Sequence, residues 1–446
     1  MSVPKNLNLK NAFDSHVHWQ GTGAFASSLD LSTLKSAEGV LQIPIRESYC
    51  RGQWFVGYGW DESFWKDRSL ITRQTLDRID HSGPILFMRA DRHGGWCNTE
   101  ALKIAGLWKK WESPHAIEGG LLELDSQGWP TGIVVDRAME QVRELVPPES
   151  KARIREHLQE GARVFNRAGY THIRDLTCNS DQWNEAVQLA EQNELTVASE
   201  IYFDIKTADQ VSATLRELER CRRTSPKLLR PKGVKIFYDG ALGSEGAFLS
   251  VPYRGHGDKF GFTLFDKKTL TQIISEIWSK DFEASVHVIG DEAAHDVVRV
   301  AKCLALTGKN GILHLEHAEL LRTETIELMD SLDVVCHFQP CHWLTDKAWA
   351  REKLPTLYSA LFRWRTLEDR GIEFDFGSDA PIEPSSIIRN LEAVEDANNN
   401  GLPSTRHPAE FYMQHSDSLW IEGCTTEVSN GRVSRVVFQG KELNIL

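Results

Sequence analysis

Short β-rich runs alternate with amphipathic helical stretches along most of this chain, and this alternation restricts the fold more than any other feature. The runs are FDSHVHW (13–19), YTHIRDLT (170–177), TVASEIYFD (196–204), GVKIFYDG (233–240), ASVHVIGD (284–291), GILHLEHA (311–318), DVVCHFQP (333–340) and IEFDFGSDAP (372–381). Stretches between them, such as KTLTQIISEIWSK, carry apolar residues at helical spacing. Strands that alternate with helices run parallel, and eight such units close into a barrel. We therefore expect an α/β fold, a (β/α)₈ TIM barrel, with an open doubly wound sheet as the alternative.

One long gap interrupts this order, because the first run ends near Trp19 and the next begins near Tyr170. We expect the barrel domain to comprise 1–28 and 151–400, and an insertion subdomain to occupy 29–150. Loops that follow barrel strands build the active site, so an insertion after the first strand is placed to roof it. The remaining tail, 401–446, has an Asn-Gly pair between β-rich flanks, which predicts a β-hairpin.

Charge and composition exclude several classes of protein. The 446 residues include 51 Lys and Arg against 63 Asp and Glu, a formal net charge of −12. Nucleic acids and anionic membranes require positive surfaces, so we expect neither as a partner. We find no signal-peptide pattern or membrane-spanning apolar run, and the eight cysteines form no C-x-x-C pair. The sequence thus predicts a cytoplasmic protein with reduced thiols that acts on a small molecule, and it leaves a homodimer open.

Histidines and an aspartate recur where the β-rich runs end. His16 and His18 are two apart in the first run, and the two-residue period of a strand puts both imidazoles on one face. His287, His317 and Asp379 each follow an apolar stem near the end of a later run. Because the carboxyl ends of parallel strands share one mouth of a barrel, these side chains should converge there. Such nitrogen and oxygen donors suit Zn²⁺ and related metals. Four other histidines are interpreted as core residues: His295, His314, His337 and His342.

Lys235 lies between apolar residues in a run that should be buried. A buried ammonium group is costly, and a cation beside metal ligands has the wrong charge. Both problems disappear if the neutral amine adds CO₂ to become a carbamate, an anion that can bridge two metal ions. The alternative is an ordinary ion pair between Lys235 and Asp239 or Glu200.

Taken together, these motifs resemble the amidohydrolase superfamily with a binuclear metal centre. The shared order is H-x-H on strand one, Lys on strand four, His on strands five and six, and Asp on strand eight. Further segments resemble the branch that contains N-substituted formamide deformylases and related amidases, over roughly residues 10 to 395. They include WFVGYGWDESFW, MRADRHGGWCNTEAL, VKIFYDGALGS, VHVIGDEA, LEHAEL and GSDAPIEP.

The resemblance implies a metal-dependent hydrolase of a C–N bond in an amide or an N-acyl or N-formyl amine. Two divalent metal ions, Zn²⁺ by preference, would be held by His16, His18, carbamylated Lys235, His287, His317 and Asp379. A hydroxide activated by the metals would attack the carbonyl carbon, and Asp379 would also be the catalytic proton shuttle. His93 and Trp96, in the insertion, match a segment that faces the metals in relatives, so they are expected to bind the substrate. Their glycine-rich surroundings, HGGWCN, favour a loop over a packed element.

The chain departs from this family pattern at three points. Only fifteen residues precede His16, where relatives carry a longer segment, so we expect the small β-sandwich of the family to be reduced or absent. Glu245 replaces an arginine and would repel a substrate anion. Asp136 replaces a glutamate and is one methylene shorter, so any role at that position would be altered.

Two other functions stay open. The first is a mononuclear, deaminase-like hydrolase that uses only His16, His18, His287 and Asp379, and Lys235 argues against it because one ion has no need of a bridging group. The second is a non-catalytic metal-binding barrel, and the complete ligand set argues against it.

Overall fold

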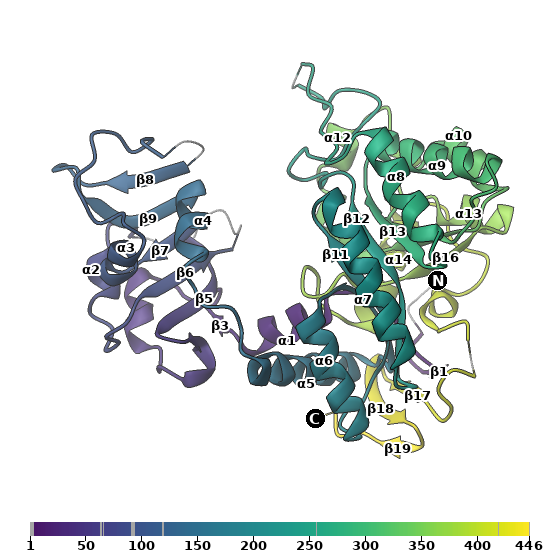
Figure 1. Cartoon of the computed structure of the whole chain (residues 1–446), viewed down its shortest axis with the longest axis horizontal. Helices are drawn as coiled ribbons and strands as arrows, with labels where there is room; N and C mark the ends of the chain where they lie inside the picture. Colours follow the sequence, from purple (N-terminus) through teal and green to yellow (C-terminus); the bar gives the residue numbers. More distant parts are fainter. Residues whose placement is uncertain are drawn as a thin grey trace. The chain divides into compact units, whose positions relative to one another are not determined.

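Two units make up the chain, and each has its own sheets (Figure 1) and its own hydrophobic clusters. The computed structural model describes residues 4–62, 65, 67–90, 94–117, 120–255, 257–417 and 419–445. One unit consists of Met1–Gly23 and Ile154–Leu446, and the other of Ala24–Arg153. The range 29–150 that the sequence marks as an insertion lies inside the second unit.

The first unit contains eight parallel strands in the order expected from the sequence. They are β2 (Phe13–Val17), β10 (His172–Cys178), β11 (Ala198–Ile205), β12 (Leu229–Phe237), β13 (Glu283–Val288), β14 (Leu313–His317), β15 (Val334–Phe338) and β16 (Glu373–Phe376). The sheet closes between β2 and β16, where Asp379 N–H donates to the carbonyl of His16 (2.7 Å) and His18 N–H donates to that of Ala380 (2.9 Å). The predicted TIM barrel is confirmed, and the open sheet is excluded.

Helices cover the outside of the barrel, as the amphipathic stretches predict (Figure 1). After α1 (Trp19–Ser27) they are α5 (Lys151–Ala168), α6 (Ser180–Glu191), α7 (Val211–Arg223), α8 (Lys267–Trp278), α9 (Asp291–Leu306), α10 (Thr323–Met329), α11 (Pro340–Asp346), α12 (Ala350–Lys353), α13 (Trp364–Arg370) and α14 (Ile387–Asn399). Side-chain oxygens of Asn179, Asp266 and Ser386 accept backbone N–H groups at the starts of α6, α8 and α14. These caps explain where the helices begin.

Two glycines let α1 lie directly against α5. A Cβ on Gly23 would lie 1.7 Å from the carbonyl oxygen of His157, and one on Gly161 would lie 2.8 Å from that of Trp19. Any larger residue would push the two helices apart. The indole N–H of Trp19 donates to the carbonyl of Leu158 (2.9 Å) at the same contact. This packing fixes the chain where it leaves β2, the strand that carries the H-x-H pair.

Segments from the two ends of the chain form a small antiparallel sheet. Its strands are β1 (Leu7–Lys10), β17 (Thr425–Ser429), β18 (Arg432–Phe438) and β19 (Lys441–Glu442). Asn430 and Gly431 join β17 to β18 and have φ of +54° and +72°. Positive φ at both positions is what a two-residue type I′ hairpin turn requires. These four strands form a small sheet separate from the barrel sheet.

The second unit is built on a mixed sheet with apolar residues on both faces. Its strands are β3 (Leu29–Asp30), β4 (Cys50–Arg51), β5 (Trp54–Trp60), β6 (Ile85–Arg89), β7 (Gly94–Cys97), β8 (Gly120–Leu124) and β9 (Pro130–Asp136), and its helices are α2 (Arg73–Leu76), α3 (Thr99–Ile104) and α4 (Arg137–Arg143). Leu86 and Cys97 belong to one hydrophobic cluster, and Phe87 and Trp96 to another. Neighbouring residues of a strand point to opposite faces, so the unit has a core on each side of its sheet.

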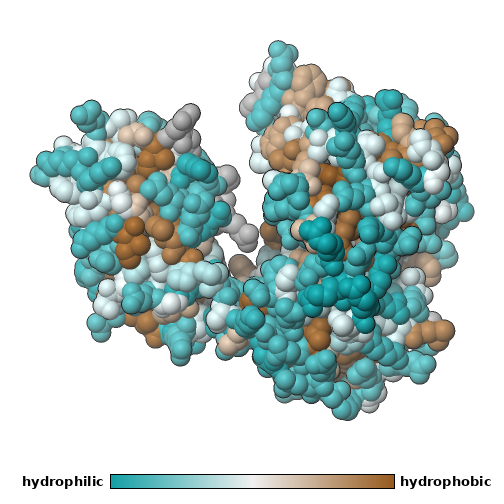
Figure 2. Space-filling view, viewed as in Figure 1, coloured by the Kyte–Doolittle hydropathy of each residue, from teal (hydrophilic) through white to brown (hydrophobic). Residues whose placement is uncertain are grey.

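Hydrophilic side chains predominate on the faces of both units that Figure 2 shows, and apolar side chains form separate patches there. None of the eight cysteines forms a disulfide. In the part of the chain that the structure describes, no helix is long and apolar enough to cross a membrane.

Candidate metal centre

Six side chains from the ends of five strands come together at the carboxyl-terminal mouth of the barrel. They are His16 and His18 at the end of β2, Lys235 on β12, His287 on β13, His317 at the end of β14 and Asp379 just after β16. The ring of His317 lies 4.7 Å from that of His16 and 4.5 Å from that of His287, measured between centroids. The parallel strands thus bring together the residues that the sequence pattern marks as metal ligands.

Asp379 is the residue on which three histidines converge. Its Oδ1 lies 3.0 Å from His18 Nε2 and 3.4 Å from His16 Nε2, and its Oδ2 lies 3.5 Å from His342 Nε2. Burial alone would raise the pKa of Asp379, but these three histidines outweigh burial and hold the pKa well below its ordinary value. The carboxylate is therefore ionised, which is the form that binds metal.

A buried carboxylate holds His16 in one orientation. His16 Nδ1–H donates to Glu316 Oε2, and Glu316 Oε1 accepts hydrogen bonds from Arg174 Nη1 and Ser285 Oγ, each at 2.7 Å. Arg174 also donates to the backbone carbonyl of Ser15 (3.3 Å). Metal-binding histidines are typically anchored in this way, because the carboxylate fixes both the tautomer and the plane of the ring. His16 Nε2 then faces Asp379.

The backbone is strained at two of the six residues. His317 has φ of +69° and Asp379 has φ of +63°, a region that costs about 1–3 kcal/mol for a residue other than glycine. Asp14 holds the segment before Asp379 in place by accepting hydrogen bonds from the N–H and hydroxyl of Ser378 (2.7 Å each) and from the hydroxyl of Ser385 (3.0 Å). Strain of this kind clusters at functional sites, where surrounding contacts enforce it.

Several buried nitrogens of the cluster have no hydrogen-bond partner among the residues that the structure describes. They are His16 Nε2, His287 Nε2, His317 Nδ1, His342 Nε2 and Lys235 Nζ. Each unpartnered buried polar group costs about 1–3 kcal/mol, and five in one place are hard to explain as core packing. Divalent metal ions would give these atoms partners, so the donor set fits a metal centre.

The protonation states of the cluster also suit metal ligands. Burial, reinforced by the charge of Lys235, lowers the pKa of His287 to about 3. Burial and the neighbouring histidines lower the pKa of His317 well below its ordinary value. Burial likewise lowers the pKa of Lys235 to about 8. Neutral imidazoles and a readily deprotonated amine are the forms that metal binding and carbamate formation need.

Lys235 has neither of the carboxylate partners that an ordinary ion pair would require. Asp239 instead accepts backbone N–H groups of Phe248, Ile289 and Gly290 (2.8–3.0 Å). Glu200 lies 3.4 Å from His415 and 3.7 Å from a different lysine, Lys232. The amine of Lys235 is fully buried, makes no hydrogen bond among the described residues, and lies 5.0 Å from the centroid of the Phe237 ring.

One histidine that we interpreted as a core residue belongs to this cluster. His342, on α11 directly after β15, stacks on His317 with centroids 5.5 Å apart and an interplanar angle of 13°. Its Nδ1–H donates to Glu319 Oε1 (2.9 Å). His314 and His337 do fit the core interpretation, because they are hydrogen-bonded to each other (2.8 Å) inside the barrel. The sequence could have indicated this role, because His342 lies only four residues beyond the end of a barrel strand.

The two predicted substrate contacts receive no support from the structure. His93 lies outside the described residues. Trp96 is fully buried, packs against Trp60 and Phe87, and donates its indole N–H to the carbonyl of Thr72 (2.9 Å). A buried indole with a satisfied N–H offers no surface to a substrate. Its glycine-rich segment is strand β7 and not the loop we expected.

Glu245 also differs from its expected behaviour. Its carboxylate forms ion pairs with Lys259 (2.7 Å) and Lys353 (3.6 Å). Two lysines compensate its charge, so the predicted repulsion of a substrate anion at this position loses its basis.

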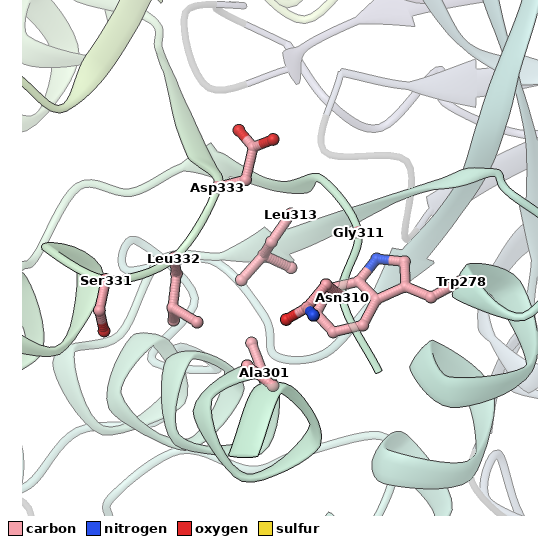
Figure 3. Close-up of a pocket in the computed structure, with 9 residues that line it drawn as sticks. Trp278, Ala301, Asn310, Gly311, Leu313, Ser331, Leu332 and Asp333 are labelled. Atoms are coloured by element: carbon pink, nitrogen blue, oxygen red, sulfur yellow. The ribbon is translucent and has the colours of Figure 1, made fainter. Parts of the chain in front are cut away.

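A separate cavity of about 400 Å³ lies at the opposite end of the barrel (Figure 3). Leu313, the first residue of β14, and Asp333, just before β15, line it together with Trp278 and residues of α9. Its lining contains one carboxylate and no histidine or cysteine. We assign it no chemistry.

We expect the substitution Glu316→Gln to weaken metal binding by about 10- to 100-fold. An amide holds His16 less tightly and leaves the buried charge of Arg174 uncompensated. Metal affinity is measured by competition with a chromophoric chelator. Glu283→Gln is the control, since Glu283 is a barrel carboxylate that pairs with Lys232 and His314 away from the six residues. Equal weakening in both variants would point to a general loss of barrel stability.

Comparison with known proteins shows the family and the fold. The model of the Amidohydrolase family matches residues 13–394. The putative amidohydrolase YtcJ of Bacillus subtilis is 29% identical over 434 residues, which cover 94% of this chain and 80% of that protein. N-substituted formamide deformylase of Arthrobacter pascens is 24% identical over 403 residues, 86% of this chain and 72% of the relative. The crystal structure of an uncharacterized metal-dependent hydrolase from Pyrococcus horikoshii has a TM-score of 0.70 at 21% identity and covers 93% of this chain and 78% of its own.

Proposed function

The chain belongs to the amidohydrolase family, and on this premise we propose that it hydrolyses a C–N bond in an amide or an N-acyl or N-formyl amine at a binuclear metal centre. The observation that carries the proposal is the group of buried, unpartnered nitrogens gathered around the ionised Asp379. The similarity to a formamide deformylase supports the choice of bond.

The residues present would hold two divalent ions, Zn²⁺ by preference. His16, His18 and Asp379 offer three donor atoms within 4.8 Å of one another. Lys235, as a carbamate, would hold the second ion with His287 and His317. When bound, such ions act as Lewis acids that polarise a carbonyl oxygen and make a water molecule a stronger acid.

Asp379 would move the proton during hydrolysis. Its ionised carboxylate can accept a proton from the attacking water as the hydroxyl group adds to the carbonyl carbon. The C–N bond then breaks, and Asp379 returns that proton to the departing nitrogen. The products are a carboxylic acid and an amine.

Glu316 and Thr177 would keep the histidines ready for this chemistry. Glu316 accepts the Nδ1–H of His16, and Thr177 Oγ1 is hydrogen-bonded to His18 Nδ1 (3.1 Å). Both contacts leave the Nε2 atoms directed at Asp379. Pre-set ligand orientations of this kind reduce the reorganisation that binding and catalysis require.

The test is a panel of N-formyl amines, N-acetyl amines and anilides, assayed for amine release by the protein reconstituted with Zn²⁺, Mn²⁺ or Co²⁺. We expect turnover of at least one substrate class, loss of that turnover on chelation, and two ions per chain. One ion per chain with full activity would favour the mononuclear hydrolase. Metal binding without turnover of any amide would favour the non-catalytic barrel.

A further inference from the structure

We propose that His342, which the family pattern does not include, is a further metal ligand and that it holds, with His317 and Asp379, the second of the two ions of the proposed function. This inference rests on the metal binding of the proposed function but not on its substrate. The donor atoms of these three residues lie within 4.8 Å of one another. The site shares Asp379 with the group formed by His16 and His18.

The two oxygens of Asp379 face different histidines. Oδ1 is directed at His16 and His18, whereas Oδ2 lies 3.5 Å from His342 Nε2. A carboxylate placed in this way can bridge two ions, one through each oxygen. His317 stacks nearly parallel to His342, and one donor atom from each ring lies within 4.8 Å of a carboxylate oxygen of Asp379.

Glu319 anchors His342 in the same way that Glu316 anchors His16. It accepts the Nδ1–H of His342 (2.9 Å) and is only 2% exposed. The anchor fixes the tautomer, so His342 Nε2 carries the lone pair when the ring is neutral. That atom is buried, makes no hydrogen bond among the described residues, and lies 3.5 Å from Asp379 Oδ2. An anchored ring with its other nitrogen free is the arrangement expected of a metal ligand.

The charges around His342 favour a cation. Among the described residues, Asp379 and Glu319 form no ion pair with lysine or arginine, and both contact His342. The contacts with these two carboxylates outweigh burial and hold the pKa of His342 well above its ordinary value, so in the metal-free chain a proton on the ring compensates part of their charge. A divalent ion bound at His342 Nε2 would take the place of that proton.

Metal stoichiometry of His342→Ala, measured without substrate, tests the proposal. The metal-free protein is titrated with Zn²⁺ against a chromophoric chelator, and the Co²⁺ form is followed by its visible absorption spectrum. We expect His342→Ala to lose one ion, or to bind it at least 10-fold more weakly, and to change the Co²⁺ spectrum. Glu319→Gln should weaken the same ion by a smaller factor.

His337→Ala is the matched control, because His337 is a buried histidine on β15 that bonds only to other barrel residues among those described. It should keep both ions. Thermal unfolding of the metal-free proteins shows whether each variant folds, and His342→Gln replaces His342→Ala if the latter does not.

The proposal is overturned if His342→Ala binds the same number of ions with wild-type affinity. A rise in KM alone, at unchanged metal content, would assign His342 to the substrate. The outcome is independent of the proposed reaction. If no amide is hydrolysed but His342→Ala still loses an ion, the metal site stands and the proposed function fails.

Discussion

Asp379→Asn is expected to fold and to lower kcat by about 10²–10⁴-fold, the usual contribution of a general acid–base group. Asp379 is the only carboxylate of the described cluster that contacts three histidines. Those histidines keep it ionised, so it can take up a proton, whereas an asparagine amide cannot. Steady-state kinetics on the best substrate of the amide panel measure the loss, and metal analysis shows which ions remain.

The matched control for this variant is Asp375→Asn. Asp375 lies on β16, four residues before Asp379, and its carboxylate accepts a hydrogen bond from His337 (2.6 Å) inside the barrel. We expect its removal to leave kcat nearly unchanged. A near wild-type kcat in Asp379→Asn would reduce Asp379 to a ligand or a structural residue and would remove the proton shuttle from the mechanism.

The barrel and the convergence of its ligands followed from the sequence because both depend on local pattern. Eight β-rich runs with helical crossovers leave few ways to bury both faces of a parallel sheet. The same topology places every strand end at one mouth, so His16, His287 and Asp379 could be brought together without knowledge of any contact. That conclusion does not depend on how many residues separate them in the sequence.

Residues that anchor the ligands could not be found in this way. Glu316 and His317 are neighbours on β14, and strict alternation would send them to opposite faces of the strand. The positive φ of His317 breaks the alternation at the strand end, so both residues approach His16. Pattern analysis assumes regular backbone, and it therefore fails where strain redirects a side chain.

At Trp96 the sequence pattern predicted the wrong local structure. Its flanking glycines predicted a loop, but Gly95 is where strand β7 packs tightly. A Cβ there would lie 2.9 Å from Met139 Cγ and 3.1 Å from side-chain atoms of Leu86 and Val134. Gly95 is present because the strand packs closely against its neighbours, and not because the chain is flexible there. Only tertiary contacts distinguish a glycine required for packing from a glycine in a flexible loop.

Lys235→Ala is expected to lose one metal ion and at least about 100-fold in kcat, since the Lewis acidity of an ion contributes several kcal/mol. Burial lowers the pKa of Lys235 to about 8, so a substantial fraction of the amine is neutral near that pH. The neutral amine can add CO₂, losing one proton and gaining a carboxylate. Metal analysis and kinetics measure both losses, and short carboxylic acids should partly restore activity by occupying the space left by the carbamate.

Lys232→Ala is the control on the same strand, because Lys232 pairs with Glu283 (2.6 Å) and reaches none of the six residues through any described ion pair. It should retain both ions. Reconstitution in CO₂-free buffer separates the carbamate from a purely structural role. If the metal-free protein takes up both ions without CO₂, and no ¹³C carbamate signal appears after exposure to ¹³CO₂, Lys235 is unmodified. The second ion would then depend on histidines and Asp379 alone, which would make the site of His317 and His342 its main support.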